Sequence, residues 1–279
     1  MPHEWKYYDN GHLKLKADWS NLFLQHGLTT VSLLTKLRHD QAVKAARTDR
    51  ITSQFQLDDQ GTVRTFFLKW HGPAPIKDWI KPILQFKRPI IGAENEFHAL
   101  QWFEQAGIAS TPVVGFGKTK TESILLTEAL VGYQKVSHLL EHSICSAEQQ
   151  LQIAQNVALV AAHMHGAGLH HQDFYLGHLM VPTSNLLALP TVIDLGRVGK
   201  FEQLPTRWIV KDLAQLCYSA RQAPVDFVRT FLAEYFQKCN RPDENTLRQR
   251  IRNKLNAIRR HDRVETTPGL EQTILSKAA

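Results

Sequence analysis

The hydrophobic pattern of this chain changes its period once, close to Ser146, and this change limits the possible folds more than any other feature. Before Ser146, short runs alternate polar and apolar residues, which is the period of a half-buried strand. After Ser146, apolar residues recur at helical spacing. We therefore expect an α+β protein in which a β-rich part precedes a helical part.

The first part contains a predicted hairpin. Residues 51–57 and 62–70 are rich in β-branched and aromatic side chains, and the turn DDQG at 58–61 joins them. The segment GAENEFHALQWFEQAG is predicted to be a helix that ends at Gly107. Further strands are predicted at 42–47, 113–117 and 123–130. These elements predict a small sheet with one inserted helix.

The second part begins with a long helix, for which Ser146 is the expected N-cap and Gly166 and Gly168 the closing residues. A polar loop, HHQDFYLGH, follows, then two short apolar runs at 179–181 and 191–194, and the pattern is helical from Trp208 onward. We expect a bilobal molecule with a small β-rich lobe, residues 1–128, and a larger helical lobe, residues 129–279.

Composition excludes several classes of protein. With 43% hydrophobic and 21% charged residues among 279, the chain is expected to be globular rather than disordered, collagenous or coiled-coil. Its net charge of +7 favours an anionic partner, but nucleic acid is not expected, because no motif interleaves basic and aromatic residues. The three cysteines follow no metal-binding pattern, so we expect buried thiols at Cys145, Cys217 and Cys239.

The N-terminal residues MPHEWKYYDNGHLKLK are polar and do not resemble a signal peptide. No run reaches the eighteen or so apolar residues of a membrane span. We therefore expect a cytoplasmic protein whose contact with a membrane is peripheral.

Two charged residues lie where packing predicts apolar ones. Lys69 is inside the apolar run 62–70, and Glu96 is in phase with Leu100 and Phe103 on the stripe of the helix that packs inward. Lys69 could be an edge-strand lysine that reaches water, and Glu96 could stabilise the positive end of the helix dipole. An inward carboxylate without a cation is costly, which favours an ion pair between the two.

Two aspartates follow in the helical part. Asp173 lies in the polar loop, and Asp194 ends the apolar run TVID before Gly196, where glycine permits a sharp turn. Taken singly, Asp173 could cap the loop and Asp194 could close an Asx turn. In order, however, a strand Lys, a helix Glu, a loop Asp and a strand-terminal Asp-x-Gly are the layout of a protein-kinase active site.

The chemistry of phosphoryl transfer explains these residue types. Lys69 would neutralise the α- and β-phosphates of ATP, and Glu96 would hold Lys69 in place. Asp194 would bind the Mg²⁺ that bridges the phosphates, and Asp173 would accept or orient the proton of the attacking hydroxyl. The β-rich lobe is then the nucleotide-binding lobe and the helical lobe the catalytic one, and Glu128 is a further candidate nucleotide-binding residue.

Four segments carry a narrower match: GAENEFHALQWFEQAGI, MHGAGLHHQDFYLGHLMV, VIDLGRV and VKDLAQLCYSA. In this order they resemble the lipopolysaccharide core heptose kinase family, bacterial enzymes that phosphorylate inner-core sugars. The resemblance runs from about Val43 to about Tyr235, and it places His178 where protein kinases have a metal-binding Asn. It implies that His178 joins Asp194 at the metal and that Asp212 ties the catalytic loop to the helical lobe.

The resemblance also implies the reaction. ATP, with Mg²⁺, would phosphorylate a heptose hydroxyl of the lipopolysaccharide core glycolipid at the cytoplasmic face of the inner membrane. Three residues depart from the family: Gln172 replaces an Arg, Gly177 replaces a Cys, and Gly196 stands where His often follows Asp-Leu. These departures concern the choice of sugar and hydroxyl, because the four residues expected for phosphoryl transfer are intact.

The glycine-rich loop that covers the phosphates in protein kinases is missing, because AVKAARTDRITSQF contains no glycine. We expect the backbone and either Arg47 or Arg50 to take its role.

A kinase-like enzyme acting on another small molecule or on a protein tyrosine stays an alternative, as does an inactive kinase-like binding module. The basic stretch 245–261 could contact anionic lipid headgroups or form a solvated helix face.

Overall fold

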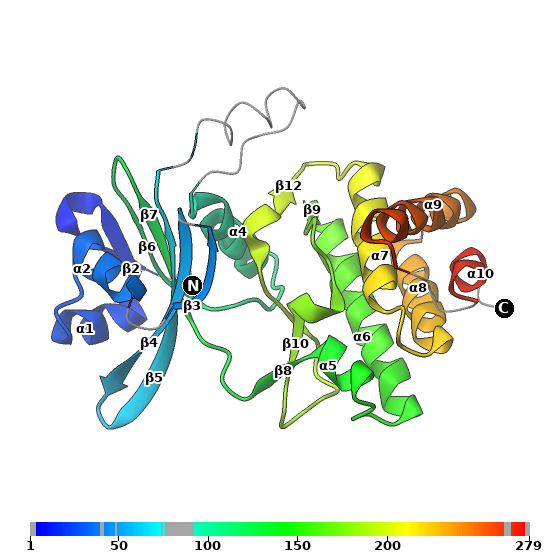
Figure 1. The fold of residues 1–279 in the computed structure, drawn as a ribbon, viewed down its shortest axis with the longest axis horizontal. Coiled ribbons are helices and arrows are strands. Elements are labelled where there is room, and N and C mark those ends of the chain that lie inside the picture. The colour runs from blue at the N-terminus through cyan, green and yellow to red at the C-terminus, as the bar shows by residue number, and fades with distance from the viewer. Residues whose placement is uncertain are drawn as a thin grey trace. The chain divides into compact units, whose positions relative to one another are not determined.

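The computed structural model describes residues 4–39, 42–47, 49–73, 75, 92–240, 242–264 and 269–276, with the backbone alone for residues 39 and 42–47. The chain forms two compact units, the first from Met1–Gln101 and Thr111–Val131 and the second from Trp102–Ser110 and Gly132–Ala279. The first unit is built on a β-sheet and the second is mainly helical, so the predicted α+β class is confirmed (Figure 1).

The sheet of the first unit is antiparallel throughout and has the strand order β1-β2-β6-β7-β5-β4-β3. Strand β5 lies between β4 and β7, so Lys69 is not on an edge strand and that interpretation is wrong. The strands are β1 (Trp5–Tyr8), β2 (Leu13–Lys16), β3 (Ala42–Arg47), β4 (Arg50–Asp59), β5 (Thr62–His71), β6 (Val113–Lys118) and β7 (Ser123–Glu128).

The predicted hairpin is the pair β4 and β5, which stay in register along their length. Its two-residue loop is Gln60–Gly61, and both residues have positive φ, 52° and 87°. This is the conformation of a type I′ turn, whose twist matches that of the flanking strands. The Asp58 carboxylate accepts a hydrogen bond from the Gly61 N–H at 3.1 Å, which stabilises the turn.

One face of the sheet packs against helices α1 (Ala17–Gln25) and α2 (Val31–Lys36), which the sequence pattern did not reveal. The ring of Phe23 in α1 meets Phe66 of β5 edge to face, with centroids 5.4 Å apart. Gly117 of β6 makes room for α2, because a Cβ there would lie 2.8 Å from Val31 Cγ2. These helices are six to nine residues long, too short for a strong periodic signal.

Helix α4 (Glu94–Gln105) confirms the predicted helix, and Gly107 follows it with φ 68°. Within the first unit, Phe97 of α4 stacks on Phe116 of β6 with centroids 4.7 Å apart. Phe116 pairs in register with Leu125, and Leu125 pairs with Lys69. Since directly paired residues share a face, Phe97 packs on the face that carries Lys69, opposite the one covered by α1 and α2.

In the second unit, Ser146 caps α6 (Ala147–Gly166) in a capping box with Gln149, as predicted. Helix α6 packs along α8 and α7 packs along α9. Short strands position the polar loop: β9 pairs with β12, and β10 pairs with β11 and β8. The remaining bounds are α5 (Val136–Glu141), α7 (Thr206–Ser219), α8 (Val225–Cys239), α9 (Glu244–Asp262), α10 (Leu270–Leu275), β8 (Tyr133–Lys135), β9 (Leu169–His170), β10 (Leu179–Pro182), β11 (Thr191–Val192) and β12 (Gly199–Lys200).

The basic residues of the stretch on α9 differ in how exposed they are. Arg248 is only 2% exposed; it donates to Glu244 and to the main-chain oxygen of Ile274, and it lies over the Phe236 ring. This arginine is therefore part of the core, which neither interpretation of the stretch anticipated. Exposed cations of the same helix are Arg250, Lys254 and Arg260.

The cysteine prediction is confirmed for two of three thiols, because Cys145 and Cys217 are buried whereas Cys239 is half-buried. Within the described ranges, none of the helices has the length and apolar character that crossing a membrane requires.

Candidate active site

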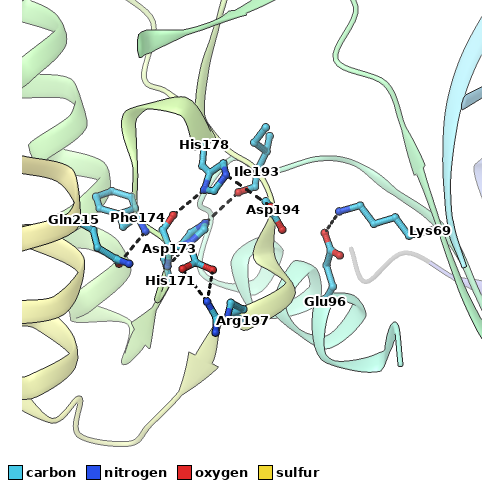
Figure 2. Close-up of polar contacts among 10 residues, drawn as sticks. All are labelled: Lys69, Glu96, His171, Asp173, Phe174, His178, Ile193, Asp194, Arg197 and Gln215. Atoms are coloured by element: carbon cyan, nitrogen blue, oxygen red, sulfur yellow. Dashed lines mark hydrogen bonds and ion pairs between the residues drawn. The ribbon is translucent and has the colours of Figure 1, made fainter. Parts of the chain in front are cut away.

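The predicted ion pair between Lys69 and Glu96 is present. Lys69 Nζ donates to Glu96 Oε1 at 2.5 Å (Figure 2). The carboxylate side chain is only 11% exposed and that of Lys69 is 24% exposed, so water screens the pair weakly. Glu96 is also in the first turn of α4, so the helix dipole stabilises its charge as well.

A further cation and a buried histidine lie on the same face as Lys69, on β4 and β5. Arg50 pairs in register with His71, and Thr52 pairs with Lys69, so these four side chains share one face of the sheet. Burial lowers the pKa of His71 from 6.5 to about 4; the charges of Arg50 and Lys69 act in the same direction, against Asp49. His71 Nδ1 is a buried polar atom that has no hydrogen-bond partner among the described residues. The face is therefore suited to an anionic ligand.

Glu128 does not join this group. It pairs in register with Phe66, whereas Lys69 pairs with Leu125, so the two charged residues lie on opposite faces of the sheet. The Glu128 carboxylate accepts from Arg64 Nη1 at 3.3 Å. Only the main chain of Glu128 is left to contact a ligand on the Lys69 face.

In the second unit, helix α7 holds the loop that carries Asp173. The Asp212 carboxylate accepts from the backbone N–H groups of His171 and Gln172 at 2.7 and 2.8 Å, which confirms the tie expected for Asp212. Gln215 accepts from the Phe174 N–H at 3.4 Å and Ser219 from the Leu176 N–H at 2.9 Å. The spacing of Asp212, Gln215 and Ser219 puts all three on one face of α7.

A buried histidine supports Asp212 from behind. His165 of α6 lies 3.4 Å from Asp212 Oδ2 through Nε2 and 2.8 Å from the Tyr235 hydroxyl through Nδ1. Burial alone would raise the pKa of Asp212. The hydrogen bond and charge of His165, together with the hydrogen bond from the His171 N–H, outweigh burial and lower this pKa below its ordinary value. Asp212 is thus held as a carboxylate that can accept from the loop.

His171 connects the loop to the segment that carries Asp194. Its Nε2 is 3.1 Å from the carbonyl oxygen of Ile193, and its Nδ1 accepts from the Asp173 N–H at 3.3 Å. A carbonyl can only accept, so Nε2 carries the proton and the ring is neutral. Burial, the largest influence, lowers the pKa of His171 and agrees with this state.

Asp173 and Arg197 form a close ion pair. Arg197 Nη1 lies 3.1 Å from both carboxylate oxygens of Asp173 (Figure 2). The side chain of Asp173 is 24% exposed and that of Arg197 is 59% exposed. The carboxylate therefore binds a guanidinium at the surface of the loop, and the loop-capping interpretation does not describe it.

Asp194 is in the left-handed region, with φ 61°, immediately before the short 3₁₀ helix Leu195–Arg197. The strand β11 ends at Val192, two residues earlier than expected, and the sharp turn falls at Asp194 itself rather than at Gly196. Such a conformation is costly for a residue other than glycine and is concentrated at functional sites. The Asp194 side chain caps nothing in this turn, so the Asx-turn interpretation is wrong.

His178 lies beside both aspartates. Its Nδ1 is 2.7 Å from the main-chain oxygen of Asp173, so Nδ1 carries a proton, and its Nε2 is 3.7 Å from Asp194 Oδ2. The structure thus brings together Asp173, His178 and Asp194 in the second unit, and Lys69 and Glu96 in the first. Across the described ranges, no three His, Cys, Asp or Glu side chains cluster as a complete metal site.

Sequence reasoning missed Gln215, Ser219, His165 and Arg197. The first two carried a usable signal, because they continue the stripe of Asp212 along a helical segment, VKDLAQLCYS, in which most other residues are apolar. Arg197 and His165 carried none, since their partners are remote in sequence.

The fold and these two groups of residues define a class of protein. An α+β chain in which a strand lysine pairs with a glutamate on a sheet-bound helix, and in which aspartates follow two short strands, has the organisation of a kinase, an enzyme that takes a phosphoryl group from ATP. The model of the lipopolysaccharide kinase (Kdo/WaaP) family matches residues 36–235. The chain belongs to this family, and it is a phosphotransferase that acts on a sugar hydroxyl of the lipopolysaccharide core.

Similar proteins agree with this assignment. The chain is 28% identical over 189 residues to the lipopolysaccharide core heptose(I) kinase WaaP of Escherichia coli K12, covering 61% of this chain and 68% of that protein. It is 27% identical over 216 residues to the WaaP of Pseudomonas aeruginosa, covering 69% and 81% respectively. A solved structure of WaaP in complex with acyl carrier protein is similar in fold, with TM-score 0.64, 23% identity, and coverage of 94% and 98%.

Proposed function

We propose that this protein transfers the γ-phosphoryl group of ATP to a hydroxyl of a heptose in the lipopolysaccharide inner core. The observation that carries the proposal is Asp173, a carboxylate whose loop is held in place by three side chains of α7. The retained Lys69–Glu96 pair argues against the inactive binding module. The names of the curated relatives favour heptose over another small molecule or a protein tyrosine.

Lys69 would neutralise the α- and β-phosphates of ATP, and Glu96 would fix the direction of its ammonium group. Arg50 replaces the missing glycine-rich loop in this proposal. It lies on the same sheet face as Lys69, beside the buried Nδ1 of His71, to which no residue in the described part of the chain bonds. The side chain of Arg47, the other arginine considered, lies outside the described residues.

The residues present fit a magnesium ion. Asp194 offers a carboxylate that is 53% exposed, and magnesium prefers oxygen ligands completed by water and nucleotide phosphates. In neutral His178 the proton is on Nδ1, so the lone pair of Nε2 is on the atom nearest Asp194. Asp194 would be the stronger ligand and His178 the weaker one. The ion, when bound, would neutralise charge on the transferring phosphoryl group.

Asp173 would orient the acceptor hydroxyl and receive its proton late in the transfer. The fixed backbone of the loop keeps its carboxylate in one place, which is most of what a side chain can contribute to this reaction. For this step the Asp173 carboxylate must release Arg197 and accept a hydrogen bond from the hydroxyl instead.

The acceptor is a glycolipid, so the protein would work at the cytoplasmic face of the inner membrane as a peripheral enzyme. The exposed cations Arg250, Lys254 and Arg260 of α9 are the groups that would meet anionic headgroups.

The test uses purified protein, ATP labelled in the γ-phosphoryl group, and lipopolysaccharide from a strain that lacks this protein. Mass spectrometry should show the gain of one phosphate on a heptose, and the deletion strain should lack that phosphate. Transfer to a different sugar, to a small molecule or to tyrosine would refute the heptose assignment. Absence of any transfer would favour the binding module.

A further inference from the structure

The Asp173 carboxylate is flanked by two cations from different parts of the second unit. Arg197, at the end of the 3₁₀ helix after Asp194, contacts both of its oxygens at 3.1 Å. Lys211, on α7, reaches the same loop, with Nζ 3.5 Å from Gln172 Oε1. Lys211 is close enough to Asp173 and Arg197 for both to influence its pKa, which burial, the largest influence, lowers.

Arg197 and Lys211 share the Asp173 carboxylate, which cannot satisfy both cations fully. The Asp212 carboxylate also acts on Lys211, but it already accepts from the backbone N–H groups of His171 and Gln172. Lys211 is partly buried, so water screens its interaction with neighbouring charges weakly. When the acceptor hydroxyl displaces Arg197 from Asp173, both cations lose the negative partner that they share, which is unfavourable unless another anion arrives with the acceptor.

The geometry places this positive charge on the acceptor side of Asp173. His178, the residue beside Asp194, bonds to the main-chain oxygen of Asp173, whereas Arg197 bonds to the carboxylate that would receive the hydroxyl. Arg197 uses only Nη1 for both oxygens, and a guanidinium has five N–H donors in a planar fork. More than half of its side chain is exposed, so this fork can turn to an oxyanion without unfolding the loop.

We infer that Arg197 and Lys211 form a binding site for an acidic group of the acceptor, a carboxylate or phosphate on the sugar next to the hydroxyl that is phosphorylated. In the free enzyme Asp173 occupies this site. Binding of the acceptor moves Arg197 to the acidic group and frees Asp173 for the hydroxyl. The enzyme thereby becomes competent only when an anionic acceptor is bound. The inference rests on the proposed function.

The test compares purified full-length wild type with Arg197→Gln, Arg197→Lys and Lys211→Gln. Arg207→Gln is the matched control, because Arg207 is an exposed cation one turn earlier on the same helix as Lys211. The acceptors are deacylated core oligosaccharide from the deletion strain, the same material after carboxyl reduction, and the same material after phosphatase treatment. Steady-state kinetics are measured for each acceptor and for ATP, and calorimetry measures oligosaccharide binding without ATP.

Arg197→Gln and Lys211→Gln should each raise the KM and the dissociation constant for intact oligosaccharide about 10- to 100-fold, the worth of a charge-assisted hydrogen bond. The KM for ATP should stay unchanged, and Arg197→Lys should recover part of the loss. The treated acceptor that has lost its relevant acidic group should bind wild type and variants equally weakly, which identifies carboxylate or phosphate as the ligand.

Equal effects of the substitutions on all three acceptors, or a raised KM for ATP, would overturn the inference and assign the cations to the nucleotide phosphates. These results would leave the proposed function standing, because wild type would still phosphorylate the oligosaccharide. If wild type transferred phosphate to none of the acceptors, the proposed function itself would fail, and this inference with it.

Discussion

His178 Nδ1 lies 2.7 Å from the main-chain oxygen of Asp173, which ties the proposed metal ligand to the backbone of the proposed catalytic aspartate. An asparagine can keep this bond through its amide N–H and can also offer an oxygen to magnesium. His178→Asn should therefore retain much of the activity, whereas His178→Ala should lower kcat about 10- to 100-fold. Steady-state assays at varied Mg²⁺ check both values, and an alanine variant with normal kcat would contradict the role.

Asp173→Asn keeps the shape of the side chain and removes its ability to accept a proton. We expect kcat to fall by about 10² to 10⁴, with the affinity for ATP nearly unchanged. Radiometric assays and nucleotide titration measure the two quantities. Asp226→Asn, an exposed aspartate on α8, is the control for the chemical change. Near-normal turnover would show that this loop is not the catalytic one.

Glu96→Gln removes the charge that orients Lys69, whereas Glu94→Gln changes an exposed carboxylate two residues away that pairs with Lys118 at 2.8 Å. We expect Glu96→Gln to raise the KM for ATP and Glu94→Gln to leave it unchanged. A double-mutant cycle with Lys69→Met should give a coupling of about 0.5–3 kcal/mol in nucleotide binding. Additive effects would mean that the pair does not act as a unit.

Asp212→Asn puts an amide where two backbone N–H groups and His165 need an acceptor. The free energy of unfolding should fall by about 3 kcal/mol, because buried donors lose a charged acceptor. Urea denaturation measures the change, with Asp226→Asn as the exposed comparison. A loss below about 0.5 kcal/mol would indicate that the loop does not depend on this carboxylate.

His170, in the strand β9 that precedes Asp173, should make the stability of the folded protein sensitive to acid. Its ring stacks on Trp208 at 4.3 Å, and burial lowers its pKa from 6.5 to about 4. The folded state thus disfavours the proton, so the stability from neutral His170 is complete above pH 6.5 and is lost as the pH falls toward 4.

His170→Phe keeps an aromatic ring on Trp208 and removes the titration. Relative to this variant, wild type should lose up to about 1.4 kcal/mol of unfolding free energy per pH unit between 6.5 and 4. Urea denaturation across this range measures the difference, and His163→Phe, at an exposed histidine of α6, controls for the substitution. Parallel stability curves for wild type and His170→Phe would contradict the prediction.

Local pattern predicted much of the fold. The β4–β5 hairpin, helix α4 and the Ser146 cap follow from turn chemistry, helical periodicity and capping preferences, which act over a few residues. Helices α1 and α2 escaped notice, because their short apolar stripes become recognisable only against the sheet that they cover.

The sequence by itself determined which groups the chemistry can use. The sequence contains a lysine and a glutamate on apolar stripes and aspartates in a set order. The chemical character of these side chains does not depend on how the chain packs. Tertiary structure decided which groups meet: it put Arg197 on Asp173, turned Glu128 to the face opposite Lys69, and placed the sharp turn at Asp194 rather than Gly196. The reason is physical, because contacts between residues remote in the chain depend on the path of the backbone, which short-range preferences do not specify.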